Sequence, residues 1–160
     1  MPVPHLEIRI VQRSKGSSAV AGAAYQAGEK LFSEYDQKMK NYIYKKEVVY
    51  TEVMLPTNAP PGYADRATLW NAAEDAEKQW NSQLARRFVV ALPREVPLEM
   101  CPKMMQEYCR EHFVSKGMCC DFATKKGVPR RGERSNAAPA RSLPPVYRHS
   151  RLTIVRRGCV

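Results

Sequence analysis

Tyr25 is the residue whose type and surroundings could carry chemistry. It stands in the run SAVAGAAYQAGEK, residues 18–30, and small residues precede it. A phenol has an ordinary pKa of ~10, and it becomes useful as a nucleophile toward phosphate when a base or a metal stabilises the developing phenolate. The small neighbours would leave room for a nucleic-acid strand to reach the hydroxyl. The alternative is that Tyr25 packs against a sheet, and the residue alone leaves both interpretations open.

Basic residues near this run are candidate phosphate contacts. Arg13 and Lys15 precede the alanine-rich segment, and the N-terminus of a helix there would favour anions through its dipole. We therefore predict that both bind DNA, although a solvated basic loop explains them equally well. Arg86 and Arg87 could line a DNA groove, but a charge pair at a strand edge is the simpler interpretation.

Metal-ligand patterns are missing from the sequence. The three histidines, His5, His112 and His149, share no HxH or HExxH spacing. The five cysteines are odd in number and include no CxxC pair, so neither a disulfide framework nor a zinc knuckle is indicated. No metal ligand is predicted from the residues themselves.

The elements that must position Tyr25 alternate between strands and helices. HLEIRIV, residues 5–11, alternates apolar and charged residues and predicts a half-buried strand. Ser17 or Ser18 can cap the alanine-rich helix, and Gly28 lies near its end. This mixed order predicts an α+β fold. The other predicted elements are two strands within 41–55, a helix over about 65–80, a strand in 86–93, a helix within 96–117 and a strand at 118–123.

Basic charge is concentrated at the C-terminal end of the 160-residue chain. Residues 124–160 hold ten of the 26 Lys and Arg residues but one of the 16 Asp and Glu residues, so they carry nearly all of the net charge of +10. This segment has no sustained periodicity and is rich in Arg, Pro and Ala, which predicts a disordered basic tail. We therefore expect an incomplete domain over residues 1–123 followed by the tail.

Neither a membrane span nor a signal peptide is expected. The chain has no run of 18 apolar residues, and its N-terminus lacks the charged and apolar blocks of a signal peptide. These features predict a cytoplasmic protein.

Several stretches together resemble a known family. Residues 4–123 resemble the N-terminal relaxase domain of the MobA/MobL plasmid-mobilisation family. The stretches are HLEIRIVQRSKGSSAVAGAAYQAGEK, SEYD, VVYTEVMLP, NAPPGYADRATLWNAAE, NSQLARRFVVALP and MCCDFA.

This resemblance implies a fold, a reaction and partners. The fold is an antiparallel sheet flanked by helices. The reaction is nicking of one DNA strand at a plasmid transfer origin, in which a tyrosine, here Tyr25, becomes linked to the 5′ phosphate and a 3′ hydroxyl is released. The implied partner is single-stranded DNA at that origin in a bacterial cytoplasm, with other mobilisation or coupling proteins as further candidates.

The sequence departs from the family at its metal site. The resemblance implies Mg²⁺ or Mn²⁺ held by three histidines, but Lys125 stands where the first is expected and no HxH pair follows. A truncation or a reading-frame change after about residue 123 would explain both this loss and the change in charge. The alternative function is therefore a non-catalytic DNA-binding fragment or a decayed relaxase, and we expect little or no covalent adduct with DNA from the chain as written.

Overall fold

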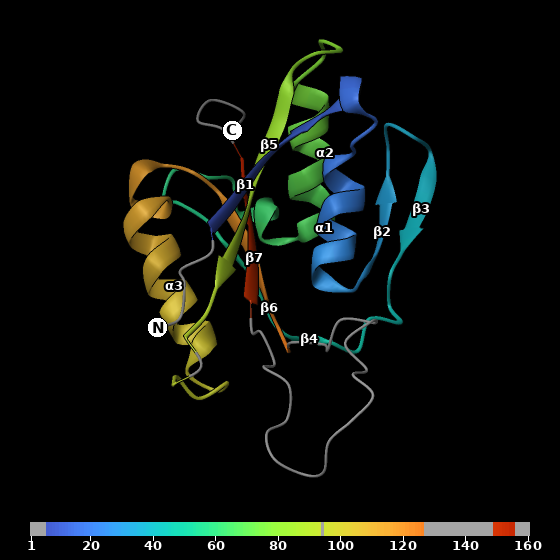
Figure 1. The fold of residues 1–160 in the computed structure, drawn as a ribbon. Helices are drawn as coiled ribbons and strands as arrows, with labels where there is room; N and C mark the ends of the chain where they lie inside the picture. Colours follow the sequence, from blue (N-terminus) through green and yellow to red (C-terminus); the bar gives the residue numbers. More distant parts are fainter. Residues whose placement is uncertain (1–5, 94, 127–148, 156–160) are drawn as a thin grey trace.

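The protein is an α+β fold built on a five-stranded antiparallel sheet (Figure 1). The structure is a computed structural model that describes residues 6–93, 95–126 and 149–155. The strand order is β1-β5-β7-β6-β4, and all four pairings are antiparallel, as the resemblance implied. The strands are β1 (Leu6–Gln12), β4 (Val48–Met54), β5 (Gln83–Ala91), β6 (Cys120–Lys125) and β7 (His149–Ile154).

Helices cover both faces of the sheet. Helices α1 (Ala19–Ala27) and α2 (Arg66–Ala76) pack on one face, whereas α3 (Cys101–His112) packs on the other (Figure 1). Strands β2 (Lys30–Ser33) and β3 (Lys38–Asn41) form a separate hairpin beside α1. Three short 3-10 helices complete the described elements: η1 (Arg13–Lys15), η2 (Pro61–Ala64) and η3 (Val114–Lys116). None of the helices described is long and apolar enough to cross a bilayer.

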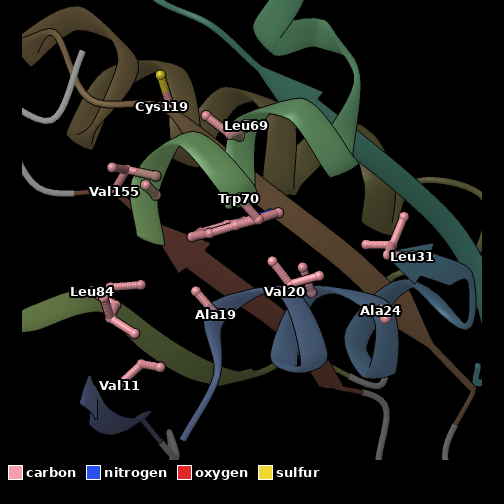
Figure 2. Packing of buried hydrophobic residues seen from close by; sticks show 13 residues of the cluster. Val11, Ala19, Val20, Ala24, Leu31, Leu69, Trp70, Leu84, Cys119 and Val155 are labelled. Atoms are coloured by element: carbon pink, nitrogen blue, oxygen red, sulfur yellow. The ribbon is translucent and has the colours of Figure 1, made fainter. Parts of the chain in front are cut away.

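The core under α1 and α2 is built around Trp70, which is fully buried. Figure 2 shows Ala19 and Val20 of α1 near this indole, with Leu84 of β5 to their left. The alanine-rich helix therefore does bury a face, because its small side chains bring its backbone close to a large indole on α2.

The central strand β7 lies inside the segment predicted as an irregular tail. Strand β6 runs two residues past the predicted boundary at 123, and β7 pairs with both β5 and β6, so that Leu152 lies between Phe88 and Phe122. The described residues 124, 125 and 149–154 of the predicted tail are therefore strand residues, and β7 includes most of RLTIV, the only stretch of the tail whose sequence suggests a strand. In β7, Leu152 and Ile154 alternate with Arg151 and Thr153, but this stretch is too short to stand out from a segment that has no sustained periodicity. The tail predicted over 127–148 and 156–160 lies outside the described residues.

Strand β1 is present as predicted but is less buried than expected. Leu6, Ile8 and Ile10 are 54%, 56% and 40% exposed. They share the sheet face of Phe88, which is the face of α3, but α3 packs over β6 and β4 at the other side of the sheet. The alternating pattern therefore predicts the strand correctly but not whether a helix covers it.

Candidate functional site

The first turn of α1 is held by a carboxylate from α2. Glu74 Oε1 accepts hydrogen bonds from Ser18 Oγ (2.8 Å), the Ala19 amide (2.6 Å) and the Val20 amide (3.1 Å). The Ser18 hydroxyl oxygen accepts a further hydrogen bond from the Ala21 amide. The amides that were expected to favour a DNA phosphate are therefore already bonded within the protein.

The other end of α1 is fixed to the sheet by Gln26, the neighbour of Tyr25. Its side-chain amide donates to the Asp121 carbonyl at 2.8 Å, and its side-chain oxygen accepts from the Thr153 hydroxyl at 2.8 Å. Gln26 is 1% exposed. Two strands, β6 and β7, thus set the position of the residue next to Tyr25.

A buried polar network supports the same part of β6. The Asp121 carboxylate accepts from Arg66 Nε (2.9 Å) and Nη2 (3.1 Å) and from Trp70 Nε1 (2.8 Å). Burial raises the pKa of Asp121, and the Arg66 guanidinium and the Trp70 indole act against that rise. The network ties α2 to β6, so both helices are held against the strand that carries Lys125 at its end.

Basic side chains surround the ring of Tyr25. The Lys45 Nζ atom lies 3.1 Å from the ring centroid, the Lys125 Nζ atom 5.0 Å and the Arg151 guanidinium carbon 5.2 Å. Tyr42 packs edge-on against the same ring, with 5.4 Å between centroids. These cations come from the loop before β4 and from β6 and β7, and they meet at a tyrosine whose side chain remains 36% exposed.

These cations change the acid strength of the phenol. The Lys45 ammonium group beside the phenol lowers the pKa of Tyr25 from its ordinary value, and Arg151 acts in the same direction. Partial burial opposes the shift. The phenolate that attack on a phosphate requires is therefore stabilised by the side chains around it.

A fourth cation, the Arg87 guanidinium, lies against α1 at Gly22, which has no side chain. Gly22 is three residues before Tyr25, and a Cβ atom at Gly22 would lie 1.9 Å from Arg87 Nη2. Burial lowers the pKa of Arg87, and the charges of Arg151 and Arg9 add to the shift. The glycine thus gives room to a guanidinium group.

Lys125 is the most buried member of this group, at 2% exposed. Burial, together with Lys45 and Arg151, lowers its pKa from 10.5 to about 7, whereas Glu47 acts in the opposite direction. Glu47 Oε1 lies 3.2 Å from Lys45 Nζ and 3.8 Å from Lys125 Nζ. One carboxylate is therefore shared between two lysines.

Comparison with known proteins establishes the family. The profile of the MobA/MobL family matches residues 17–135. The chain belongs to the MobA/MobL family. Among the relatives of this MobA/MobL chain, the conjugal transfer protein TraA of Agrobacterium fabrum is 33% identical over 132 residues, 76% of this chain and 12% of that protein. The probable mobilization protein MobA of Bifidobacterium longum is 32% identical over 77% of this chain and 22% of its own length.

A solved structure shows the same fold. It is described as "Molecular Basis of Vancomycin Resistance Transfer in Staphylococcus aureus" and matches with a TM-score of 0.80 and 25% identity over 98% of this chain and 72% of that chain. The fold is therefore relaxase-like. The mobilization protein MobL of Acidithiobacillus ferridurans is 32% identical over 77% of this chain. This MobA/MobL chain spans about a third of the MobL protein and less of the relatives above.

The divalent metal implied by the resemblance does not fit the side chains around Tyr25. Those side chains are ammonium and guanidinium groups, which are cations and, when protonated, have no lone pair for a metal. Glu47 alone adds a carboxylate to the two lysines. Within 6–93, 95–126 and 149–155, no three His, Cys, Asp or Glu side chains are grouped so that they could hold a metal ion.

Arg13 and Lys15, the two other predicted site residues, differ from each other in burial. Arg13 is 7% exposed, and its guanidinium donates to the Glu74 and Glu77 carbonyls and lies 4.5 Å from the ring centroid of Tyr35. It therefore has a structural role at the C-terminal end of α2. Lys15 is exposed on η1. That either residue binds DNA stays a prediction.

Sequence reasoning missed most of the basic group around Tyr25. It selected Tyr25, weighed Arg87 as part of a charge pair, and noted Lys125 as a lost histidine. Lys45 and Arg151 carried no signal, because they lie 20 and 126 positions from Tyr25 in the sequence and meet it through the fold. RLTIV, residues 151–155, is a possible strand in the sequence, and its alternation could have indicated that Arg151 lies on the opposite face from Leu152.

Proposed function

We propose that this MobA/MobL chain nicks one strand of DNA at a plasmid transfer origin, with Tyr25 as the nucleophile. The Tyr25 oxygen would attack the phosphorus of one phosphodiester group and form a phosphotyrosine bond to the 5′ side. The bond to the 3′ oxygen would break, that oxygen would take up a proton, and the phenolic proton would pass to solvent. The reaction needs no oxidant or reductant.

The observation that carries this proposal is the setting of Tyr25. Its ring is partly exposed, its neighbour Gln26 is bonded to two strands, and Lys45 and Arg151 lower its pKa. Family membership and relatives named as conjugal transfer and mobilisation proteins support the choice of DNA as substrate. Single-stranded DNA and other mobilisation or coupling proteins are the partners we propose.

A second candidate function is DNA binding without cleavage. It is favoured by the poor fit of the residues at Tyr25 to a divalent metal, since a metal is one established means of stabilising charge during phosphate transfer. The two candidates make the same contacts with DNA and differ in whether a covalent bond forms.

Covalent capture of DNA tests the first candidate. A random pool of end-labelled single-stranded oligonucleotides is incubated with the protein in Mn²⁺ or in EDTA, and adducts that survive denaturation are counted and sequenced. The sequence alone predicts little or no adduct, but Lys45 and Arg151 lower the pKa of Tyr25, so we now expect one. It should be lost in Tyr25→Phe and kept in Tyr44→Phe, since Tyr44 is 83% exposed but has no cation contact of this kind among the described residues.

The other outcomes are equally informative. Non-covalent binding without any adduct would establish the second candidate. An adduct that persists in Tyr25→Phe would show that another residue is the nucleophile.

A further inference from the structure

Positive charge at Tyr25 exceeds negative charge among the residues that the structure describes. Lys45, Lys125, Arg87 and Arg151 converge there from four parts of the fold, and Glu47 is the carboxylate that contacts the two lysines. We call these four basic residues the cation cluster. Burial of like charges side by side costs free energy unless a group of opposite sign compensates it.

The cluster also has unused hydrogen-bond donors. The Nζ atoms of Lys45 and Lys125 and the Nε atoms of Arg87 and Arg151 are buried and have no hydrogen-bond partner in the part of the chain that the structure describes. Buried donors are nearly always bonded in native proteins. Four of them around one partly exposed ring indicate that a ligand with several acceptor oxygens belongs there.

We propose that the cation cluster is a binding site for a phosphodiester group of single-stranded DNA, and that its positive charge compensates the negative charge of that group beside Tyr25. The inference rests on the proposed function for the identity of the strand, and it deepens that function by naming the residues that hold the phosphate. A phosphate carries negative charge on oxygens that ammonium and guanidinium groups bind well. Its place beside the Tyr25 ring brings it next to the nucleophile.

Gly22 is part of this arrangement. Because a Cβ atom there would lie 1.9 Å from Arg87 Nη2, Gly22→Ala must displace the guanidinium, which is the movable end of a long side chain. Alanine is also favoured over glycine within a helix by about 1 kcal/mol. This variant therefore moves a member of the cluster without removing a charge and without weakening α1.

Binding is tested in the Tyr25→Phe background and in EDTA, so that neither chemistry nor a metal contributes. The probes are a short single-stranded DNA of mixed sequence and inorganic phosphate, titrated at fixed ionic strength. We expect Lys45→Met, Arg87→Met and Lys125→Met each to weaken DNA binding by about tenfold, the scale of one charge-assisted hydrogen bond. Inorganic phosphate should compete with the DNA.

Two matched controls separate the cluster from general effects. Lys46→Met removes an exposed positive charge beside Lys45 and should weaken binding less than twofold. Gly62→Ala adds a methyl group where nothing lies within 4 Å and should have no effect, whereas Gly22→Ala should weaken binding severalfold with an unchanged or higher melting temperature.

Each outcome decides between the two proposals. Equal losses in Lys45→Met and Lys46→Met, or no loss in any cluster variant, would overturn the phosphate site. So would an adduct that requires Mn²⁺ and is insensitive to Lys45→Met and Lys125→Met, although nicking by Tyr25 would then stand. Cluster-dependent binding in a protein that forms no adduct would support the phosphate site and reject nicking.

Discussion

Lys125 gives the site a dependence on pH that can be measured in the folded protein. Burial, with the charges of Lys45 and Arg151, lowers the pKa of Lys125 from 10.5 to about 7, and Glu47 opposes the shift. Between these two values the unfolded chain binds a proton that the folded chain does not. The free energy of unfolding should therefore rise with pH from about 7 to about 10. Below pH 7 it should be lowered by the full cost of burying the charged Lys125 side chain.

The matched substitution Lys125→Met should remove this rise. Since one pKa unit corresponds to about 1.4 kcal/mol, the difference between variant and parent should grow to a few kcal/mol in favour of the variant as pH falls from about 10 to about 7, and it should then stay constant below pH 7. Urea unfolding at several pH values from 6 to 10 measures it, with Lys46→Met as the control whose curve follows the parent. Parallel curves for Lys125→Met and the parent would show that Lys125 stays protonated in the fold.

How far single residues could be predicted from the sequence depends on how local their signal is. Tyr25 could be selected because its small neighbours are adjacent in the chain. Lys45, Arg87 and Arg151 could not be assembled around it, because a basic residue in a loop or strand shows no feature that indicates its partner across the sheet. Arg13 shows that a local signal leaves contacts out, because nothing beside it in the sequence indicates that its guanidinium bonds the Glu74 and Glu77 carbonyls.

Helix α1 depends on α2 for its start. Glu74 Oε1 accepts three hydrogen bonds from Ser18, Ala19 and Val20, and its charge suits the helix dipole. Glu74→Ala leaves these donors without that acceptor in a buried place, so we expect a loss of about 2 kcal/mol in the free energy of unfolding. Asp75→Ala is the control, because Asp75 is exposed on the same helix. Equal losses in the two variants would show that the cap contributes nothing specific.

Helices α1 and α2 could be predicted well and some strands could not. The capping residues Ser18 and Asp65 and the left-handed Gly28 are local signals, and they mark the observed ends. The two strands predicted within 41–55 reduce to β4, because β3 ends at Asn41 and pairs with β2 in a different sheet. Pairing partners are set by contacts over long sequence separation, which a local pattern does not report.

Strand β7 joins the two halves of the five-stranded sheet. It lies between β5 and β6, and no pairing joins β5 directly to β6 in the described chain. Its side chains Leu152 and Ile154 are buried in the core under α3. The expectation of a compact domain over residues 1–123 therefore leaves out the strand that connects the two halves of the sheet.

A chain that ends at residue 126 should consequently fail to fold cooperatively. Burial of the Leu152 and Ile154 side chains contributes about 2 kcal/mol each to stability, and this contribution is lost. The backbone groups of β5 and β6 that pair with β7 also lose their hydrogen-bond partners. Together these are a large part of the 5–15 kcal/mol that stabilises an ordinary domain. A chain that ends at residue 155 keeps β7 and is the matched control. Thermal unfolding followed by circular dichroism should show a sharp transition for the longer chain only, and equal midpoints for both would show that β7 is not needed for the sheet.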